Sequence, residues 1–238
     1  MLQNTRAIVI HTFPYSDSSL ILKAYTEKFG YASFLLKGFK KNRRQKVILH
    51  PMAEVEISAI IHSNSGLNVV RNIDLQNPYS QILMDPIKSG MAMFLAEWLG
   101  YSIREEGEGD VDFFNWLNNA VDSLNHSNSI ANFHIWFLIK LCGFLGFAPQ
   151  GARSSSYPYF NLKEGHFTSA AAFNGNLNNN ESLLINEVLN KNLQELSLVK
   201  LNKIERAQLL QLIKHYYQIH LEREFNLKSL DVLTQLYD

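Results

Sequence analysis

The sequence predicts an α+β protein, with a small five-stranded barrel at the N-terminus followed by an all-α helical domain. Two observations predict this class. Residues 5–71 contain short runs rich in Val, Ile, Tyr and Phe separated by turn residues, as strands do. From about residue 80 the apolar residues recur every three or four positions, which is the period of helices. We therefore expect two domains, residues 1–78 and residues 79–238, divided at the Asn77-Pro78 break.

The strands of the predicted barrel are short and closely spaced. We expect them near residues 5–12, 19–26, 31–37, 52–62 and 67–71. The fourth is the clearest, because apolar residues alternate along it with mostly polar ones: Ala53, Val55, Ile57, Ala59 and Ile61. The Ser63-Asn64-Ser65-Gly66 turn predicts a hairpin to the fifth strand. Closure into a barrel is favoured because a flat sheet would leave two open edges.

The helical part begins with a regular apolar stripe. Phe114, Leu117, Val121 and Leu124 recur at helical spacing, and the acidic residues before Phe113 favour a helix start there. The segment 130–147 is apolar nearly all round, which predicts a helix at the centre of a bundle. Residues 209–221 have one apolar side and predict an outer helix. Between these helices, residues 148–180 form the longest irregular segment, of the kind that is usually functional or mobile.

Composition excludes several classes of protein. With 46% hydrophobic and 12% aromatic residues, the chain has ample apolar surface for a folded core. The single cysteine, Cys142, rules out an internal disulfide and a cysteine-based zinc cluster. The opening residues MLQNTRAIVIHTF do not resemble a secretory signal, and polar residues interrupt the most apolar stretch. We therefore expect a cytoplasmic protein.

Charge is balanced overall but unevenly distributed. The chain has 22 basic and 22 acidic residues, yet residues 1–80 hold ten of the basic and only five of the acidic ones. Six cations lie in ten consecutive positions without an intervening acid: Lys37, Lys40, Lys41, Arg43, Arg44 and Lys46. This run predicts a loop that binds phosphates, and Phe39 within it could stack on a base. The alternative is a solvated surface loop, but repulsion among six cations makes that less favourable without a partner.

Several segments, taken in order, resemble the RecO family of bacterial recombination mediators and DNA repair proteins. The opening TRAIVIHTFPYSDSSLILKAYTEKFGYASFLLKGFKKNRRQ is similar to that family's first three strands and basic loop. HPMAEVEI resembles the entry into its fourth strand, LIKLCGFLGFAPQ the helix end before its central insertion, and LKSLDVL its closing motif. The similarity covers most of the chain and is strongest in residues 1–75.

This resemblance implies an N-terminal OB-fold, a helical domain and a role in the RecF pathway of recombination. Members of the family bind single- and double-stranded DNA, anneal complementary strands and pair with RecR. They also contact the acidic C-terminal tail of single-strand-binding protein (SSB) and help to load RecA. By resemblance we expect the same partners here, in the nucleoid region of a bacterial cytoplasm. For the SSB tail we suggest Lys203, Arg206 and Lys214.

The chain departs from the family pattern in the central insertion. Many members carry a four-cysteine zinc site there, whereas ARSSSYPYFNLKEGHFTSAA has no cysteine and a single histidine, His166. One histidine cannot supply the four ligands of structural zinc, so we expect neither a metal nor another cofactor. Aromatic side chains should pack the insertion in place of the metal: Tyr157, Tyr159, Phe160 and Phe167.

The sequence offers no recognisable catalytic site. Its eight histidines form no known constellation, and His134 and Cys142 lie among apolar residues typical of a core. The acidic run from Glu105 to Asp112 suggests helix capping more than a magnesium site, and no phosphate-binding GxxxxGK[ST] motif is present. We expect a non-enzymatic DNA-binding mediator. The alternatives are an assembly adaptor whose basic loop meets an acidic protein and, third, a nucleic-acid-modifying enzyme.

Overall fold

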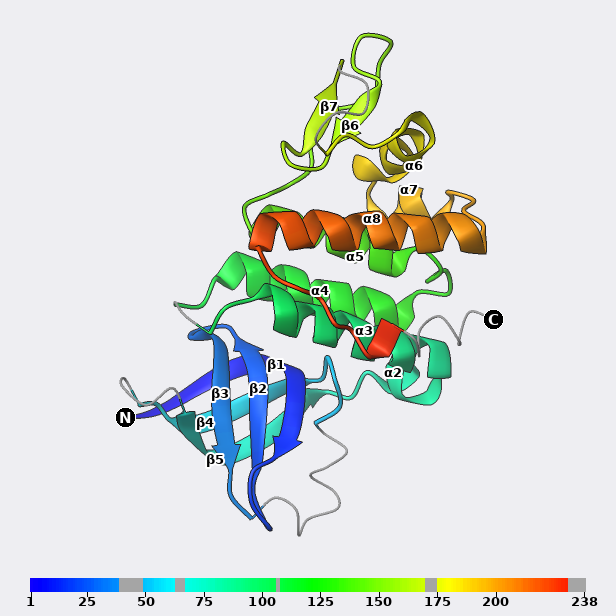
Figure 1. Ribbon diagram of the computed structural model, residues 1–238. Coiled ribbons are helices and arrows are strands. Elements are labelled where there is room, and N and C mark those ends of the chain that lie inside the picture. Colours follow the sequence, from blue (N-terminus) through cyan, green and yellow to red (C-terminus); the bar gives the residue numbers. More distant parts are fainter. Residues whose placement is uncertain (39–48, 63–66, 106–107, 170–174, 231–238) are drawn as a thin grey trace. The chain divides into compact units, whose positions relative to one another are not determined.

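The computed structural model describes residues 1–38, 49–62, 67–105, 108–169 and 175–230 (Figure 1). It divides into two compact units. The first unit comprises Met1–His126 together with the segment from Leu227 onward, and the second comprises Ser127–Asn226. The first unit contains the strands β1 (Leu2–Pro14), β2 (Leu20–Thr26), β3 (Gly30–Leu36), β4 (Glu54–Ile60) and β5 (Leu67–Asn77), and the helices α2 (Ser80–Met84), α3 (Pro86–Ser102) and α4 (Val111–His126).

The five strands of the first unit form a closed barrel in the order β1-β2-β3-β5-β4, with β4 pairing back onto β1 (Figure 1). All pairs are antiparallel except β3 with β5, where Ser33 faces Leu67 and Leu35 faces Val69 in parallel register. This arrangement is that of the OB-fold. Apolar side chains fill the interior, because on each strand inward-facing residues alternate with outward-facing ones. The inward-facing residues include Ala7, Val9, Leu22, Ala24, Phe34, Val55 and Ile57.

A bulge in β1 changes which side chains face outward. Val9 pairs with Ala24 and His11 pairs with Lys23, so Ile10 is an extra residue between two pairs. Since side chains alternate along a strand, one extra residue moves every later side chain to the other face. His11 therefore joins Lys23 on the outer surface of the barrel, and the side chain of His11 is exposed.

Two acidic residues fix the starts of the long helices in the first unit. The Oδ1 atom of Asp85 accepts backbone hydrogen bonds from Ile87 at 2.8 Å and from Lys88 at 3.3 Å, which caps α3. Asp110 accepts one from Phe113 at 3.0 Å, which confirms the acidic helix start predicted there. Helix α4 then packs on the barrel through Phe113, whose ring centroid is 4.6 Å from that of Tyr25.

The second unit is built around the apolar helix α5 (Phe133–Phe144). Its core side chains are at most 2% exposed, which confirms the predicted buried helix: Phe133, Ile135, Phe137, Leu138 and Leu141. The other elements are β6 (Tyr159–Asn161), β7 (His166–Thr168), α6 (Asn179–Leu189), α7 (Leu193–Ser197) and α8 (Lys203–Leu221). Helices α6, α7 and α8 each begin with the same Asn and Glu capping box, which satisfies their first backbone N–H groups.

The α+β class and the barrel predicted from the sequence are confirmed. Both β1 and β5 are longer than expected, and the segment 148–180 contains the two-stranded sheet β6–β7, which the sequence did not predict. The predicted hairpin turn at residues 63–66 lies outside the described residues. The predicted domain boundary at residue 78 lies directly after the barrel strands, whereas the first compact unit continues to His126.

Candidate nucleic-acid interface

The segment predicted to bind phosphates joins β3 to β4. Lys37 directly follows the last residue of β3, and its side chain is exposed. Gly38 then has φ 73°, a left-handed conformation that glycine adopts without strain. The remaining predicted contacts lie outside the described residues, so their role stays a prediction: Phe39, Lys40, Lys41, Arg43, Arg44 and Lys46.

A second exposed cation, Arg71, lies on the strand next to Lys37. The parallel register pairs Leu35 with Val69, so Lys37 and Arg71 each follow two residues later on adjacent strands. An irregularity in the β4–β5 pairing falls at Arg71. Within the described residues neither cation has an ion-pair partner. Sequence reasoning missed Arg71 because only strand pairing, not sequence proximity, associates it with the basic run.

Arg6 is a barrel cation that the fold itself uses. Its Nη2 atom donates to Oε1 of Glu27 at 2.6 Å, and its Nη1 atom is 3.9 Å from a carboxylate oxygen of Glu54. Its guanidinium carbon also lies 4.9 Å from the ring centroid of Phe114 in α4. The hydrogen bond from Arg6 lowers the pKa of Glu27. Arg6 therefore joins β1 to the β2–β3 turn and to α4, and its charge is already compensated.

The acidic segment between α3 and α4 docks on β2 and β3. Oε1 of Glu105 is 2.5 Å from Nζ of Lys23 and accepts a hydrogen bond from Oγ of Ser33 at 3.1 Å. The N–H of Gly109 donates to the carbonyl of Lys28 at 3.1 Å. A Cβ atom at Gly109 would come within 2.1 Å of a backbone oxygen of the β2–β3 turn, so glycine is required for this approach. The segment thus compensates the charge of Lys23.

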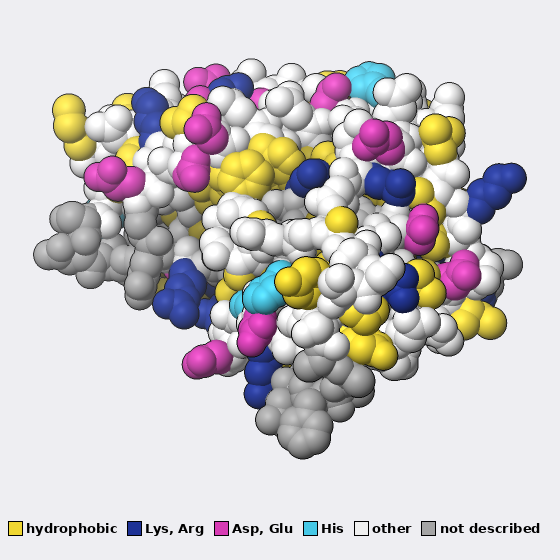
Figure 2. All heavy atoms as spheres, turned by 90° about the horizontal axis from the view of Figure 1, so that it is seen from above, with side chains coloured by type: hydrophobic (Ala, Val, Ile, Leu, Met, Phe, Trp, Pro, Cys, Tyr) yellow, Lys and Arg dark blue, Asp and Glu magenta, His cyan; other side chains and the backbone are white. Residues whose placement is uncertain are grey.

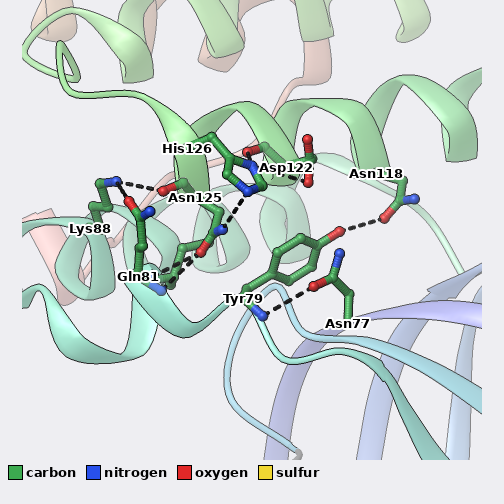
Figure 3. Close-up of polar contacts among 9 residues, drawn as sticks. Asn77, Tyr79, Gln81, Lys88, Asn118, Asp122, Asn125 and His126 are labelled. Atoms are coloured by element: carbon green, nitrogen blue, oxygen red, sulfur yellow. Dashed lines mark hydrogen bonds and ion pairs between the residues drawn. The ribbon is translucent and has the colours of Figure 1, made fainter.

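Polar side chains also join the helices of the first unit to one another (Figure 3). Lys88 is only 4% exposed, and its Nζ atom donates to Oε1 of Gln81 at 2.8 Å and to the carbonyl of Asn125 at 2.6 Å. Oδ1 of Asn125 accepts a backbone hydrogen bond from Gln81 at 3.0 Å. Nearby, the hydroxyl of Tyr79 donates to Asn118 at 2.9 Å. Lys88 therefore stabilises the helix junction and is not available to a ligand.

The insertion that lacks the zinc-site cysteines is packed by aromatic rings. Phe160 and Phe167 meet edge to face with centroids 5.2 Å apart, and they are 1% and 6% exposed. The prediction of aromatic packing is confirmed for these two side chains and wrong for Tyr157, which is 55% exposed. Tyr159 is half-buried. In the part of the chain that the structure describes, no three His, Cys, Asp or Glu side chains gather as metal ligands would.

The cations suggested for the SSB tail all lie on α8. Arg206 donates to the carbonyl of Leu201 at 2.6 Å. An open groove of about 590 Å³ lies beside the start of α8, but the lysines that line it are Lys191 and Lys200, together with three glutamates. The face shown in Figure 2 carries basic and acidic side chains interspersed with hydrophobic ones. The suggested tail contacts therefore remain a prediction.

Two residues examined for catalysis lie in the core, as predicted. His134 is 3% exposed, and burial lowers its pKa to about 3, so the imidazole is neutral at physiological pH. Burial likewise raises the pKa of the Cys142 thiol to about 12, which makes a reactive thiolate unfavourable. Among the described helices, none is both long and apolar enough to cross a bilayer.

The barrel places this chain in the class of OB-fold proteins, many of which bind oligonucleotides or oligosaccharides. Residues 1–79 match the family model "Recombination protein O N terminal", and residues 83–231 match "Recombination protein O C terminal". The chain is 36% identical over 243 residues to the DNA repair protein RecO of Bacteroides fragilis, with 100% of each chain covered. It is 32% identical over 240 residues to that of Christiangramia forsetii, again with 100% coverage.

The chain therefore belongs to the RecO family, as the ordered sequence motifs indicated. Membership of this family supports a role in DNA repair and recombination.

Proposed function

We propose that this protein is a DNA-binding recombination mediator of the RecF pathway. It binds single- and double-stranded DNA, anneals complementary strands and, with RecR, helps to load RecA onto SSB-coated DNA. The proposal is carried by family membership together with an OB barrel whose β3–β4 connection holds six cations and no acid before Lys46. The residues proposed to contact DNA are Lys37, Phe39, Lys40, Lys41, Arg43, Arg44 and Lys46.

The proposed mechanism is electrostatic. Each cation that approaches a phosphate releases a condensed counterion, which supplies binding free energy without reading the base sequence. Two strands held at one cationic surface repel each other less, so complementary bases can meet. The charges of Arg6 and Lys23 are compensated by carboxylates, which makes these two residues less suitable phosphate contacts than the exposed Lys37. The mediator needs no catalytic group, and we place its action in the cytoplasm.

A salt series tests the phosphate contacts. Binding of fluorescent single-stranded DNA should weaken with a log–log slope of about −2 to −4, the value for three to six phosphate contacts on a single strand. Replacing Lys40, Lys41, Arg43 and Arg44 with Ala should make the slope shallower and weaken binding. A matched control replaces four cations of the second unit with Ala, which removes the same charge elsewhere: Lys140, Lys163, Lys191 and Lys200.

Annealing of complementary strands by the same proteins tests the activity. The wild type and the control should anneal, whereas the loop variant should not. Equal loss in the loop variant and the control would mean that only net charge matters, and the assignment of the loop would be wrong. If the wild type bound an acidic protein partner in nuclease-treated extract but annealed nothing, the adaptor function would replace this proposal.

A further inference from the structure

We propose that a pocket between the barrel and α3 receives an unstacked base of single-stranded DNA. The pocket has a volume of about 580 Å³, and all the residues that line it belong to the first unit. This volume falls within the roughly 300–1,000 Å³ typical of sites for small organic groups. The inference rests on the proposed DNA-binding function and adds a base site to the phosphate-binding loop.

The barrel wall of this pocket is aromatic because of the bulge at Ile10. The shift in register turns His11 and Phe13 outward, and their rings stack with centroids 5.8 Å apart and an interplanar angle of 26°. Tyr31 of β3 lies on the same wall, with Nζ of Lys23 5.8 Å from its ring centroid. His11 is exposed and Phe13 is half-buried, so both rings are accessible. Such rings offer stacking surfaces to any base.

The opposite wall is α3, which approaches the barrel closely at Gly100. A Cβ atom there would lie 3.6 Å from Cγ2 of Ile10 and 3.6 Å from the hydroxyl of Tyr31, so the two walls are in contact at this point. Tyr101 and Met93 line the pocket further along the same helix, and Met93 is 43% exposed. The pocket thus presents flat rings and apolar side chains with an opening to solvent.

The third wall is formed by Lys228 and Ser229, and Lys228 contributes a cation. The carboxylate of Glu97 accepts backbone hydrogen bonds from Lys228 at 3.1 Å and Ser229 at 2.8 Å, and it also accepts one from the hydroxyl of Ser229. These bonds satisfy the acceptor oxygens of Glu97, which stays negatively charged. The side chain of Lys228 is exposed, and within the described residues no ion-pair partner holds it. Lys228 is therefore the rim cation that suits a phosphate attached to a bound base.

The pocket is also connected to the predicted phosphate-binding loop by a short stretch of chain. Pro51 lines the pocket and follows Lys46 by five residues. Pro51 therefore belongs to the same β3–β4 connection as the residues proposed to contact phosphates. We propose that one strand of DNA places phosphates on the loop and a neighbouring base against the exposed side of the rings. Flat stacked rings favour this occupant over an acidic peptide.

The test separates base binding from phosphate binding. Affinities are measured for an oligothymidylate and for an abasic strand of equal length, which has the same phosphates and no bases. The wild type should bind the oligothymidylate at least about fivefold more tightly, the minimum expected for one stacked base. Phe13→Leu, which keeps apolar volume but removes the ring, and His11→Ala should each reduce this preference. Neither should change the affinity for the abasic strand or its salt slope.

Controls address folding and the competing occupant. Tyr157→Ala removes an exposed ring from the second unit and should change neither affinity. His11 is exposed, so its replacement should leave thermal unfolding unchanged. A synthetic peptide of alternating Asp and Phe serves as the acidic probe. If the wild type bound this peptide, Phe13→Leu did not, and the preference for bases persisted in the variant, the pocket would belong to a protein partner and the inference would be wrong.

The remaining outcomes distinguish this inference from the proposed function. Wild-type binding that is indifferent to bases would overturn the base pocket while leaving the phosphate loop intact. The same conclusion would follow if both variants kept the base preference at its full wild-type size. If the wild type bound neither strand, the proposed function would fail, and the base pocket with it.

Discussion

The two compact units use charged side chains in different ways. In the first unit, Arg6 and Lys23 pair with carboxylates on the barrel, and Lys88 is buried among neutral acceptors. In the second unit, α5 packs through apolar and aromatic side chains, and burial keeps His134 neutral. The carboxylates of its capping boxes lie at the ends of helices. Charge thus helps to hold the first unit together, while the core of the second excludes it.

The largest expected effect comes from removing the buried charge of the first unit. Lys88→Met should lower the free energy of unfolding by about 3 kcal/mol, because it leaves the buried carbonyl of Asn125 without its donor. The matched change Lys200→Met, at an exposed position of the second unit, should alter it by less than about 0.5 kcal/mol. Denaturant unfolding of both variants measures this contrast. If Lys88→Met and Lys200→Met lowered the free energy of unfolding equally, the buried lysine would not contribute more stability than the exposed one, and the contrast between the units would be wrong.

An effect of intermediate size is expected from the neutral histidine of the second unit. The pKa of His134 is about 3 in the folded protein and about 6.5 when unfolded, so the unfolded chain binds the proton more tightly. The free energy of unfolding therefore suffers no loss from His134 above about pH 6.5, and it falls as the pH drops from there toward 3. Between about pH 6 and pH 4, the wild type should lose about 1.4 kcal/mol per pH unit more than His134→Leu does. The measurement is the free energy of unfolding of both proteins as a function of pH, and parallel curves would contradict the prediction.

The smallest effect is expected at a surface cap of the second unit. Oδ1 of Asn202 accepts a hydrogen bond from the backbone N–H of Glu205 at 3.0 Å. In return, the Glu205 carboxylate accepts one from the backbone N–H of Asn202 at 2.8 Å. Asn202→Ala should lower the free energy of unfolding by about 1 kcal/mol, and Asn202→Asp should restore most of it. Since neither change affects the core, the slope of the unfolding free energy against denaturant concentration (the m-value) should stay constant. If Asn202→Ala lowered the free energy of unfolding as much as Lys88→Met does, the helix cap would contribute as much stability as the buried lysine, and this prediction would be wrong.

Local sequence patterns sufficed for the elements but not for their pairing. Alternation at residues 53–61 and the helical stripe from Phe114 to Leu124 each depend on residues close in sequence, and both elements formed as predicted. The sheet β6–β7 was missed because each strand has only three residues, too few to show a period. Lys88 was missed because nothing beside it in sequence distinguishes a buried lysine from an exposed one.

The α+β class, the change of period near residue 80, the family and the run of cations between β3 and β4 follow from the amino-acid sequence alone. Each of these features depends on residues that are close together in the sequence. Two features become visible only in the folded chain. Strand β3 pairs in parallel with β5, which places Arg71 on the strand beside Lys37, and a bulge in β1 turns His11 and Phe13 outward. These features depend on contacts between residues distant in sequence, whose register follows from packing and strand pairing in the closed barrel.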